Sequence, residues 1–128
     1  MELSYPVQRF IEDNIVNIEQ GKWAELFYYA MFALTSPQSA ELFSVVDEVL
    51  NIDPSSAIED ALIMWCKDNV ALRYDRKVAV SKVMQNIPHF GLGYATLRLM
   101  FYAAVKTAYP NKTVLPDSYG IEYVVEKK

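Results

Sequence analysis

Apolar residues recur at intervals of three and four along most of this chain, which is the spacing that one face of an α-helix presents. Between Ser4 and Gly21 the apolar positions are Val7, Phe10, Ile11, Ile15 and Ile18. Ser4 is a suitable helix N-cap, and Gly21 can adopt the left-handed conformation that closes a helix. We therefore predict one amphipathic helix between these two residues.

The stretch from Trp23 to Leu34 differs because it has no polar face. Eleven of its twelve residues are apolar or aromatic, and only Glu25 is charged. A helix of this composition is expected to be buried on all sides, and it is too short to cross a bilayer, which takes about 20 residues. We predict that it pairs antiparallel with the first helix and lies at the centre of the fold.

Proline, glycine and capping residues divide the middle of the chain into further helices. Ser36 and Asp53, each followed by a proline, begin the third and fourth helices. A break near residues 73–75 precedes a short fifth helix that ends at Pro88. A last, strongly apolar helix is predicted over residues 94–109 and forms the second central element.

The tail changes from a helical to an alternating pattern. Residues 112–115 and 121–125 have the composition of two short strands around a turn that contains proline and glycine. A lone hairpin is only marginally stable, so this one is expected to pack on the helices or to pair with a partner. We predict a mainly all-α protein: a compact bundle of six to seven short helices over residues 1–110, with a small C-terminal β-hairpin or extended tail over residues 111–128 in the same domain.

The composition is typical of a globular protein, with 52% hydrophobic and 22% charged residues in a chain of 128. Cys66 is the only cysteine, which excludes a disulfide within the chain, and His89 is the only histidine. Together they supply too few ligands for a structural zinc site. Charged residues interrupt the first 20 positions, so no signal segment is expected. We expect a cytoplasmic protein with no metal, no cofactor and no membrane contact.

The net charge of −4 hides an asymmetry between the two halves of the chain. Residues 1–60 hold 11 acidic residues against two basic ones, whereas residues 61–128 hold five acidic residues against ten basic ones. Acidic residues seven positions apart share a helix face. We predict that they form a surface for a basic protein partner, at Glu12, Glu19, Glu41, Asp47, Glu48, Glu59 and Asp60. Ordinary solvated helix faces are the alternative.

Tyrosine is abundant, with nine residues in the chain. Tyr119 and Tyr123 lie in the tail, where some rings should be exposed. Tyrosine favours interfaces because it buries a large ring and keeps a polar tip. We predict both as anchors for a partner, and packing of the tail on the helices is the alternative.

Arg73, Arg76 and Lys77 form the densest basic group and are a weak candidate for binding phosphate. The sequence pI near 4.9 argues against nucleic acid, and pairing with the protein's own acidic helices is the alternative. Gly91 and Gly93 precede a helix, but the third glycine of a dinucleotide-binding motif is absent, so this segment is interpreted as a turn.

Catalytic residues are not predicted. Cys66 and His89 would act as a nucleophile pair only if they were in contact and a third group oriented the ring. Cys66 follows Trp65 on an apolar helix, where a buried thiol is ordinary. Adjacent carboxylates such as Glu59 and Asp60 point about 100° apart on a helix and do not form a dyad by themselves.

These patterns favour three classes of function, in order. The first is a small acidic intracellular protein that binds a basic protein, as an inhibitor or an immunity-type neutraliser of a toxin nuclease does. The second is a structural or assembly module that self-associates or joins a larger complex. The third is a small-ligand-binding or enzymatic helical domain.

Overall fold

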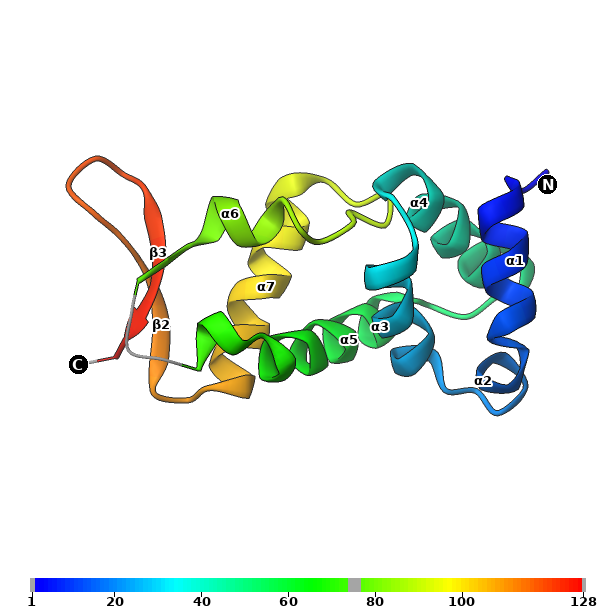
Figure 1. Ribbon diagram of the computed structural model, residues 1–128, viewed down its shortest axis with the longest axis horizontal. Helices are drawn as coiled ribbons and strands as arrows, with labels where there is room; N and C mark the ends of the chain where they lie inside the picture. Colours follow the sequence, from blue (N-terminus) through cyan, green and yellow to red (C-terminus); the bar gives the residue numbers. More distant parts are fainter. Residues whose placement is uncertain (1, 74–76, 128) are drawn as a thin grey trace.

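The fold is elongated, with helices along most of its length and a small sheet at one end (Figure 1). A computed structural model describes residues 2–73 and 77–127. The two ends of the chain lie at opposite ends of the long axis (Figure 1). The prediction of a mainly helical protein with a C-terminal hairpin is confirmed.

The described residues form seven α-helices, two short helical turns and three strands. The α-helices are α1 (Tyr5–Asp13), α2 (Ile15–Glu19), α3 (Trp23–Ala33), α4 (Ser36–Ser44), α5 (Ser55–Asp68), α6 (Val80–Met84) and α7 (Tyr94–Ala108). The helical turns are the π-helix η1 (Val45–Val49) and the 3-10 helix η2 (Val70–Leu72). The strands are β1 (Val78–Ala79), β2 (Lys112–Pro116) and β3 (Glu122–Glu126).

The first predicted helix is interrupted at Asn14 and forms α1 and α2. The backbone of Asn14 has φ −115° and ψ 20°, and its side-chain Nδ2 donates to Phe10 O at 2.9 Å. An asparagine side chain competes with helical backbone hydrogen bonds in this way. Gly21 ends the segment with a φ of +68°, in the left-handed conformation that was predicted.

Helix α5 is the centre of the hydrophobic core, because α3 and α7 both pack against it. Its buried residues are Ala57, Ile58, Ala61, Leu62, Trp65 and Cys66. Helix α3 contributes Leu26, Phe27, Ala30 and Met31, and α7 contributes Leu97, Phe101, Ala104 and Val105. The two predicted central helices are therefore placed on either side of a third helix.

The prediction that α3 is buried on all sides is wrong. Phe32 is 66% exposed and Tyr29 is 48% exposed. Both rings pack against the ring of Tyr28, whose hydroxyl donates to the carboxylate of Asp68 on α5. One face of α3 meets α5, and the other is an exposed aromatic surface.

The C-terminal hairpin is part of a three-stranded antiparallel sheet in the order β1, β3, β2. Val78 of β1 lies opposite Val124 of β3, and Val114 of β2 lies opposite Val124 on the other side. Strand β1 was not predicted, because it occupies the start of the expected fifth helix, which is reduced to α6. The two residues of β1 are too few to show the alternation of a strand in the sequence. Their pairing with β3 determines their conformation.

The sheet packs on the helices through its inner face. Val78, Val114 and Val124 belong to the hydrophobic core or contact it, and Val124 is 1% exposed. Arg98 of α7 forms an ion pair with Glu122 of β3, with 3.1 Å between Nη1 and Oε1. The opposite face of the sheet is therefore the outer face.

Candidate functional site

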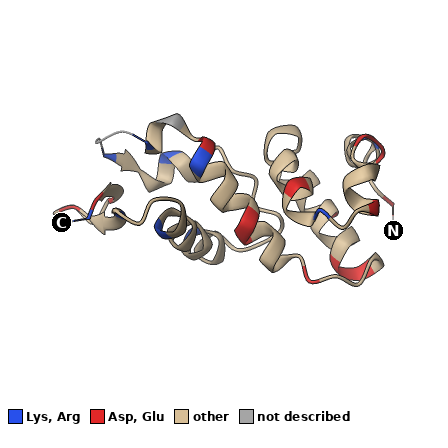
Figure 2. Cartoon of the chain, turned by 90° about the horizontal axis from the view of Figure 1, so that it is seen from below, with Lys and Arg blue, Asp and Glu red and all other residues tan. Residues whose placement is uncertain are grey.

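The acidic residues predicted to bind a partner are exposed, with one exception. These exposed residues are Glu12, Glu19, Asp47, Glu48, Glu59 and Asp60. No ion pair joins any of them to a Lys or Arg within residues 2–73 and 77–127. Figure 2 shows most acidic segments toward the N-terminal end of the molecule and most basic segments toward the C-terminal end. The charge asymmetry of the sequence is thus also an asymmetry in space.

Glu41 is the exception. It is half-buried on α4, and its two carboxylate oxygens accept hydrogen bonds from Ser4 N at 2.8 Å and Ser4 Oγ at 2.7 Å. Ser4 therefore binds α4 instead of capping α1 with its side chain. The carboxylate of Glu41 is occupied within the fold.

A hollow of about 410 Å³ lies where the start of α3 meets the start of α5. We call it the acidic hollow. Its charged lining residues are Glu25 in the first turn of α3, Asp53 before α5, Asp60 on α5, and the single base Lys22. Asp53 Oδ1 accepts from Ser55 N at 3.0 Å and so helps to begin α5. Trp23 and Ala57 supply apolar wall.

Only Asp60 of these carboxylates was predicted to be in a site. Glu25 was visible in the sequence as the one charge in an apolar helix, and Asp53 as a helix cap, but their approach depends on how α3 packs on α5. Among the described residues, no group of three or more His, Cys, Asp or Glu side chains is arranged to hold a metal ion.

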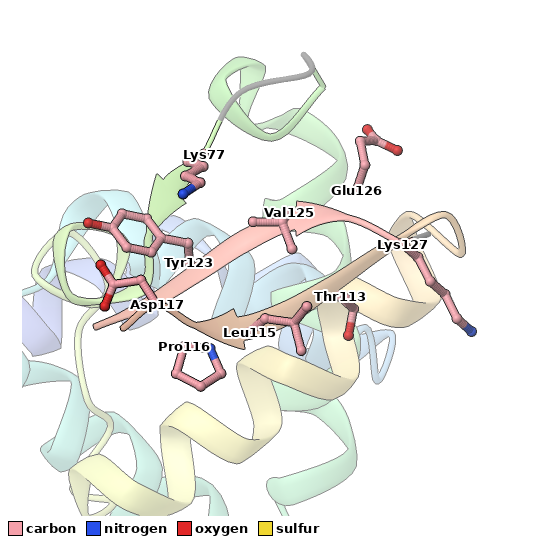
Figure 3. Close-up of a pocket in the computed structure, with 9 residues that line it drawn as sticks. All are labelled: Lys77, Thr113, Leu115, Pro116, Asp117, Tyr123, Val125, Glu126 and Lys127. Atoms are coloured by element: carbon pink, nitrogen blue, oxygen red, sulfur yellow. The ribbon is translucent and has the colours of Figure 1, made fainter. Parts of the chain in front are cut away.

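A second hollow, of about 510 Å³, lies on the outer face of the C-terminal sheet. We call it the sheet hollow. Alternate residues of β2 and β3 point into it (Figure 3), and its apolar floor consists of Leu115, Tyr123 and Val125. Lys77, which precedes β1, and Lys127, which follows β3, stand at its margins (Figure 3).

The charges that line the sheet hollow are mixed, with Lys77 and Lys127 against Asp117 and Glu126. Asp117 Oδ1 accepts from Tyr119 N at 2.9 Å and from Ile121 N at 3.0 Å, which closes the β2–β3 turn. Glu126 binds Lys112 and Asn111. Lys77 Nζ lies 5.4 Å from the centre of the Tyr123 ring, a cation–π contact, and forms no ion pair with a described carboxylate.

The structure places the two predicted tyrosines differently. Tyr123 is half-buried in the sheet hollow, in contact with Lys77. Tyr119 is 87% exposed in the turn between β2 and β3. The β-period of the tail, with residues 113 and 115 opposite 125 and 123, is the sequence signal that would have predicted the apolar outer face.

The predicted basic group is only partly described. Arg73 donates from Nε and Nη2 to Lys67 O, at 3.2 and 3.0 Å, and so contacts the last turn of α5. Lys77 faces the sheet hollow. Arg76 lies outside the described residues. A phosphate site at these three residues remains a prediction.

Cys66 and His89 are in different surroundings. Cys66 is fully buried on α5, and burial raises the pKa of its thiol to about 12. His89 is half-buried; its backbone N donates to Ser36 Oγ at 3.1 Å, and its ring lies 6.2 Å from that of Tyr94. No hydrogen bond joins Cys66 to His89 in the described part of the chain. A thiol in this environment is protonated at neutral pH and is a weak nucleophile.

The glycine segment before α7 is explained by packing. Gly91 has a φ of +76°, and a Cβ at this position would lie 3.2 Å from Ala40 Cβ on α4. Next to it, Phe90 N donates to Ser39 Oγ at 3.0 Å. The absence of a side chain at Gly91 lets this loop approach α4 closely, as a turn of this kind requires.

Comparison of the chain with protein-family models, with curated proteins and with solved structures found no match. None of the helices in residues 2–73 and 77–127 combines the length and apolarity that crossing a membrane requires. The candidate surfaces are thus defined by their geometry and charge: the acidic hollow, the exposed carboxylates of the N-terminal half, and the sheet hollow with its two lysines.

Proposed function

We propose that this protein binds a basic protein partner through its acidic N-terminal half, as an inhibitor or immunity-type neutraliser does. The observation that supports the proposal is that four exposed carboxylates have no basic partner among the described residues. The carboxylates of Glu59 and Asp60 on α5, like those of Asp47 and Glu48, form no ion pair with a described base. A field of this kind speeds association with a cationic surface and weakens as salt is added.

The acidic hollow gives the proposal a specific contact. Its carboxylates at Glu25, Asp53 and Asp60 outnumber the single base Lys22. Its apolar wall at Trp23 suits the aliphatic part of a lysine or arginine side chain, whose charged end the carboxylates then bind. A partner that depends on such a side chain in its own active site, as a nuclease does to hold phosphate, would lose activity on binding.

The free thiol of Cys66 fits a reducing compartment. We propose accordingly that binding takes place in the cytoplasm.

Affinity capture from native lysate, followed by mass spectrometry, tests the proposal. The bait proteins are the wild type and the variant Glu59→Lys/Asp60→Lys. The control is Lys82→Glu/Lys106→Glu, which reverses two exposed charges on α6 and α7. We expect a basic protein on the wild type and the control, and its loss from the α5 variant.

Titration of the captured partner then measures the effect. We expect the α5 variant to bind about tenfold or more weakly, and its affinity to depend less on salt. Equal capture by the wild type and the α5 variant, or the enrichment of no basic protein, would overturn the proposal. Circular dichroism of each variant shows whether the fold is retained.

A further inference from the structure

The sheet hollow combines an exposed apolar floor with two lysines at its margin. Leu115 is 54% exposed on its floor, beside Tyr123 and Val125, so water contacts a continuous apolar surface there. Lys77 and Lys127 border this surface; of the two carboxylates that also line it, Glu126 pairs with Lys112, and Asp117 holds the β2–β3 turn. A molecule that covers this floor and also carries negative charge would match both features of the hollow.

The turn η1 has that combination of properties. Leu50 N donates to Val45 O at 3.0 Å, the i to i−5 bond of a π-helix, and Val46 anchors the turn in the core. The four residues that follow the anchor are all exposed: Asp47, Glu48, Val49 and Leu50. Two carboxylates thus stand beside two aliphatic side chains. Single π-helical turns are rare and occur often at functional sites.

These two surfaces lie at opposite ends of the molecule. The sheet is at one end in Figure 1, and η1, which continues α4, lies behind α1 at the other end. The η1 turn of one chain therefore cannot reach its own sheet hollow, and a contact between these surfaces joins two molecules.

We propose that the protein associates with itself head to tail, with the η1 turn of one copy docked in the sheet hollow of the next. Asp47 and Glu48 meet Lys77 and Lys127, and the side chains of Val49 in η1 and of Leu50 after it cover the apolar floor. Each copy carries one surface of each kind, so the contact is heterologous and can add one copy after another. This inference goes beyond the proposed function: it shares Asp47 and Glu48 with the proposed acidic surface but uses neither Glu59 nor Asp60.

Sedimentation velocity tests the proposal through two reversed variants. The η1 variant is Asp47→Lys/Glu48→Lys, and the sheet variant is Lys77→Glu/Lys127→Glu. The controls are Glu12→Lys/Glu19→Lys and Lys82→Glu/Lys106→Glu, which change the net charge by the same amounts at other exposed positions. At low salt, we expect the mass of the wild type and of both controls to rise above 14.7 kDa as concentration increases.

Each reversed variant alone is expected to remain a monomer at every concentration. An equimolar mixture of the two is expected to associate again, because the intact η1 of one meets the intact sheet hollow of the other. A wild type that stays monomeric, controls that lose association as the variants do, or a mixture that stays monomeric would each overturn the proposal. The variant Glu59→Lys/Asp60→Lys, expected to associate like the wild type, separates this result from the proposed function.

Discussion

Glu41 on α4 holds the start of α1 through Ser4, because both of its carboxylate oxygens accept hydrogen bonds from that one residue, at 2.8 and 2.7 Å. The backbone N and the hydroxyl of Ser4 are the donors. Helices α1 and α4 pack against each other, so the pair fixes the N-terminal helix on the bundle. Glu48, seven residues later, makes no such contact among the described residues, although both were predicted for the same surface.

Replacement of Glu41 is therefore expected to affect stability rather than partner binding. Glu41→Ala removes both acceptors and should lower the free energy of unfolding by about 1 to 2 kcal/mol. The matched control Glu48→Ala should change it by less than about 0.5 kcal/mol. Urea denaturation measures both values. Equal effects of the two substitutions would contradict the structural role of Glu41.

Lys112 is 3% exposed, and its ammonium lies 3.1 Å from Glu126 Oε1. Replacement of the carboxylate weakens an ion pair of a buried ammonium, whereas loss of the lysine leaves a carboxylate that water can reach. We expect Glu126→Gln to lower the free energy of unfolding by about 2 kcal/mol, and Lys112→Met by about 1 kcal/mol or less. Thermal and urea denaturation give the two values. The reverse order would show that Lys112 stabilises the sheet through its charge.

The thiol of Cys66 should be unreactive in the folded protein. Burial raises its pKa to about 12, so little thiolate exists at neutral pH, and the reagent cannot reach it. We expect a disulfide reagent such as Ellman's reagent to label one thiol per chain in denaturant and almost none in buffer. Cys66→Ala is the control for background. Rapid labelling of the native protein would contradict the burial of this residue.

The hydrogen bond from Tyr28 to Asp68 should make stability depend on pH in alkaline solution. This bond, together with burial, raises the pKa of Tyr28 to about 12, from the ordinary tyrosine value of 10.0. The folded state therefore holds this proton more tightly than the unfolded chain does. The resulting stabilisation is complete below pH 10 and is lost as the pH rises through 12.

We accordingly expect the difference in unfolding free energy between the wild type and Tyr28→Phe to shrink across this range. Urea denaturation of both proteins at several pH values measures this difference. Titratable groups that both proteins contain contribute equally to the two free energies, so their effect cancels in the difference. Tyr29→Phe is the matched control, since the hydroxyl of Tyr29 makes no hydrogen bond within the described residues. A difference that stays constant through pH 12 would contradict the raised pKa of Tyr28.

The pattern of apolar and polar residues predicted those helices and strands whose conformation is determined by residues within the same segment. The apolar stripe of α7, the proline at the start of α4 and the alternation in the tail each occur within one segment, and each predicted the observed element. Strand β1 could not be predicted in this way, because Val78 and Ala79 become a strand only through their pairing with β3. The break at Asn14 arises because its side chain competes with the backbone for helical hydrogen bonds. The spacing of apolar residues carries no information about this competition.

The sequence predicted that one half of the protein has an acidic surface, but not which residues come together on it. Charge counts predicted an acidic half, and the structure shows the exposed carboxylates, but Glu25 and Asp53 join Asp60 only because α3 crosses the start of α5. The uniform run from Trp23 to Leu34 contains no periodicity that could identify which side faces water. The outward position of Phe32 therefore follows from the packing of α3 on α5 alone.

The order of the strands also sets the order in which this protein can be built. Strand β3 lies between β1 and β2, yet both of its neighbours leave the ribosome before it does. The helices of a nascent chain can assemble early. Val78 and Val114 cannot take their places in the sheet at that stage, because Val124, which pairs with both, has not yet been made. The sheet closes only when translation has passed residue 126, and until then neither the floor of the sheet hollow nor any contact made there exists.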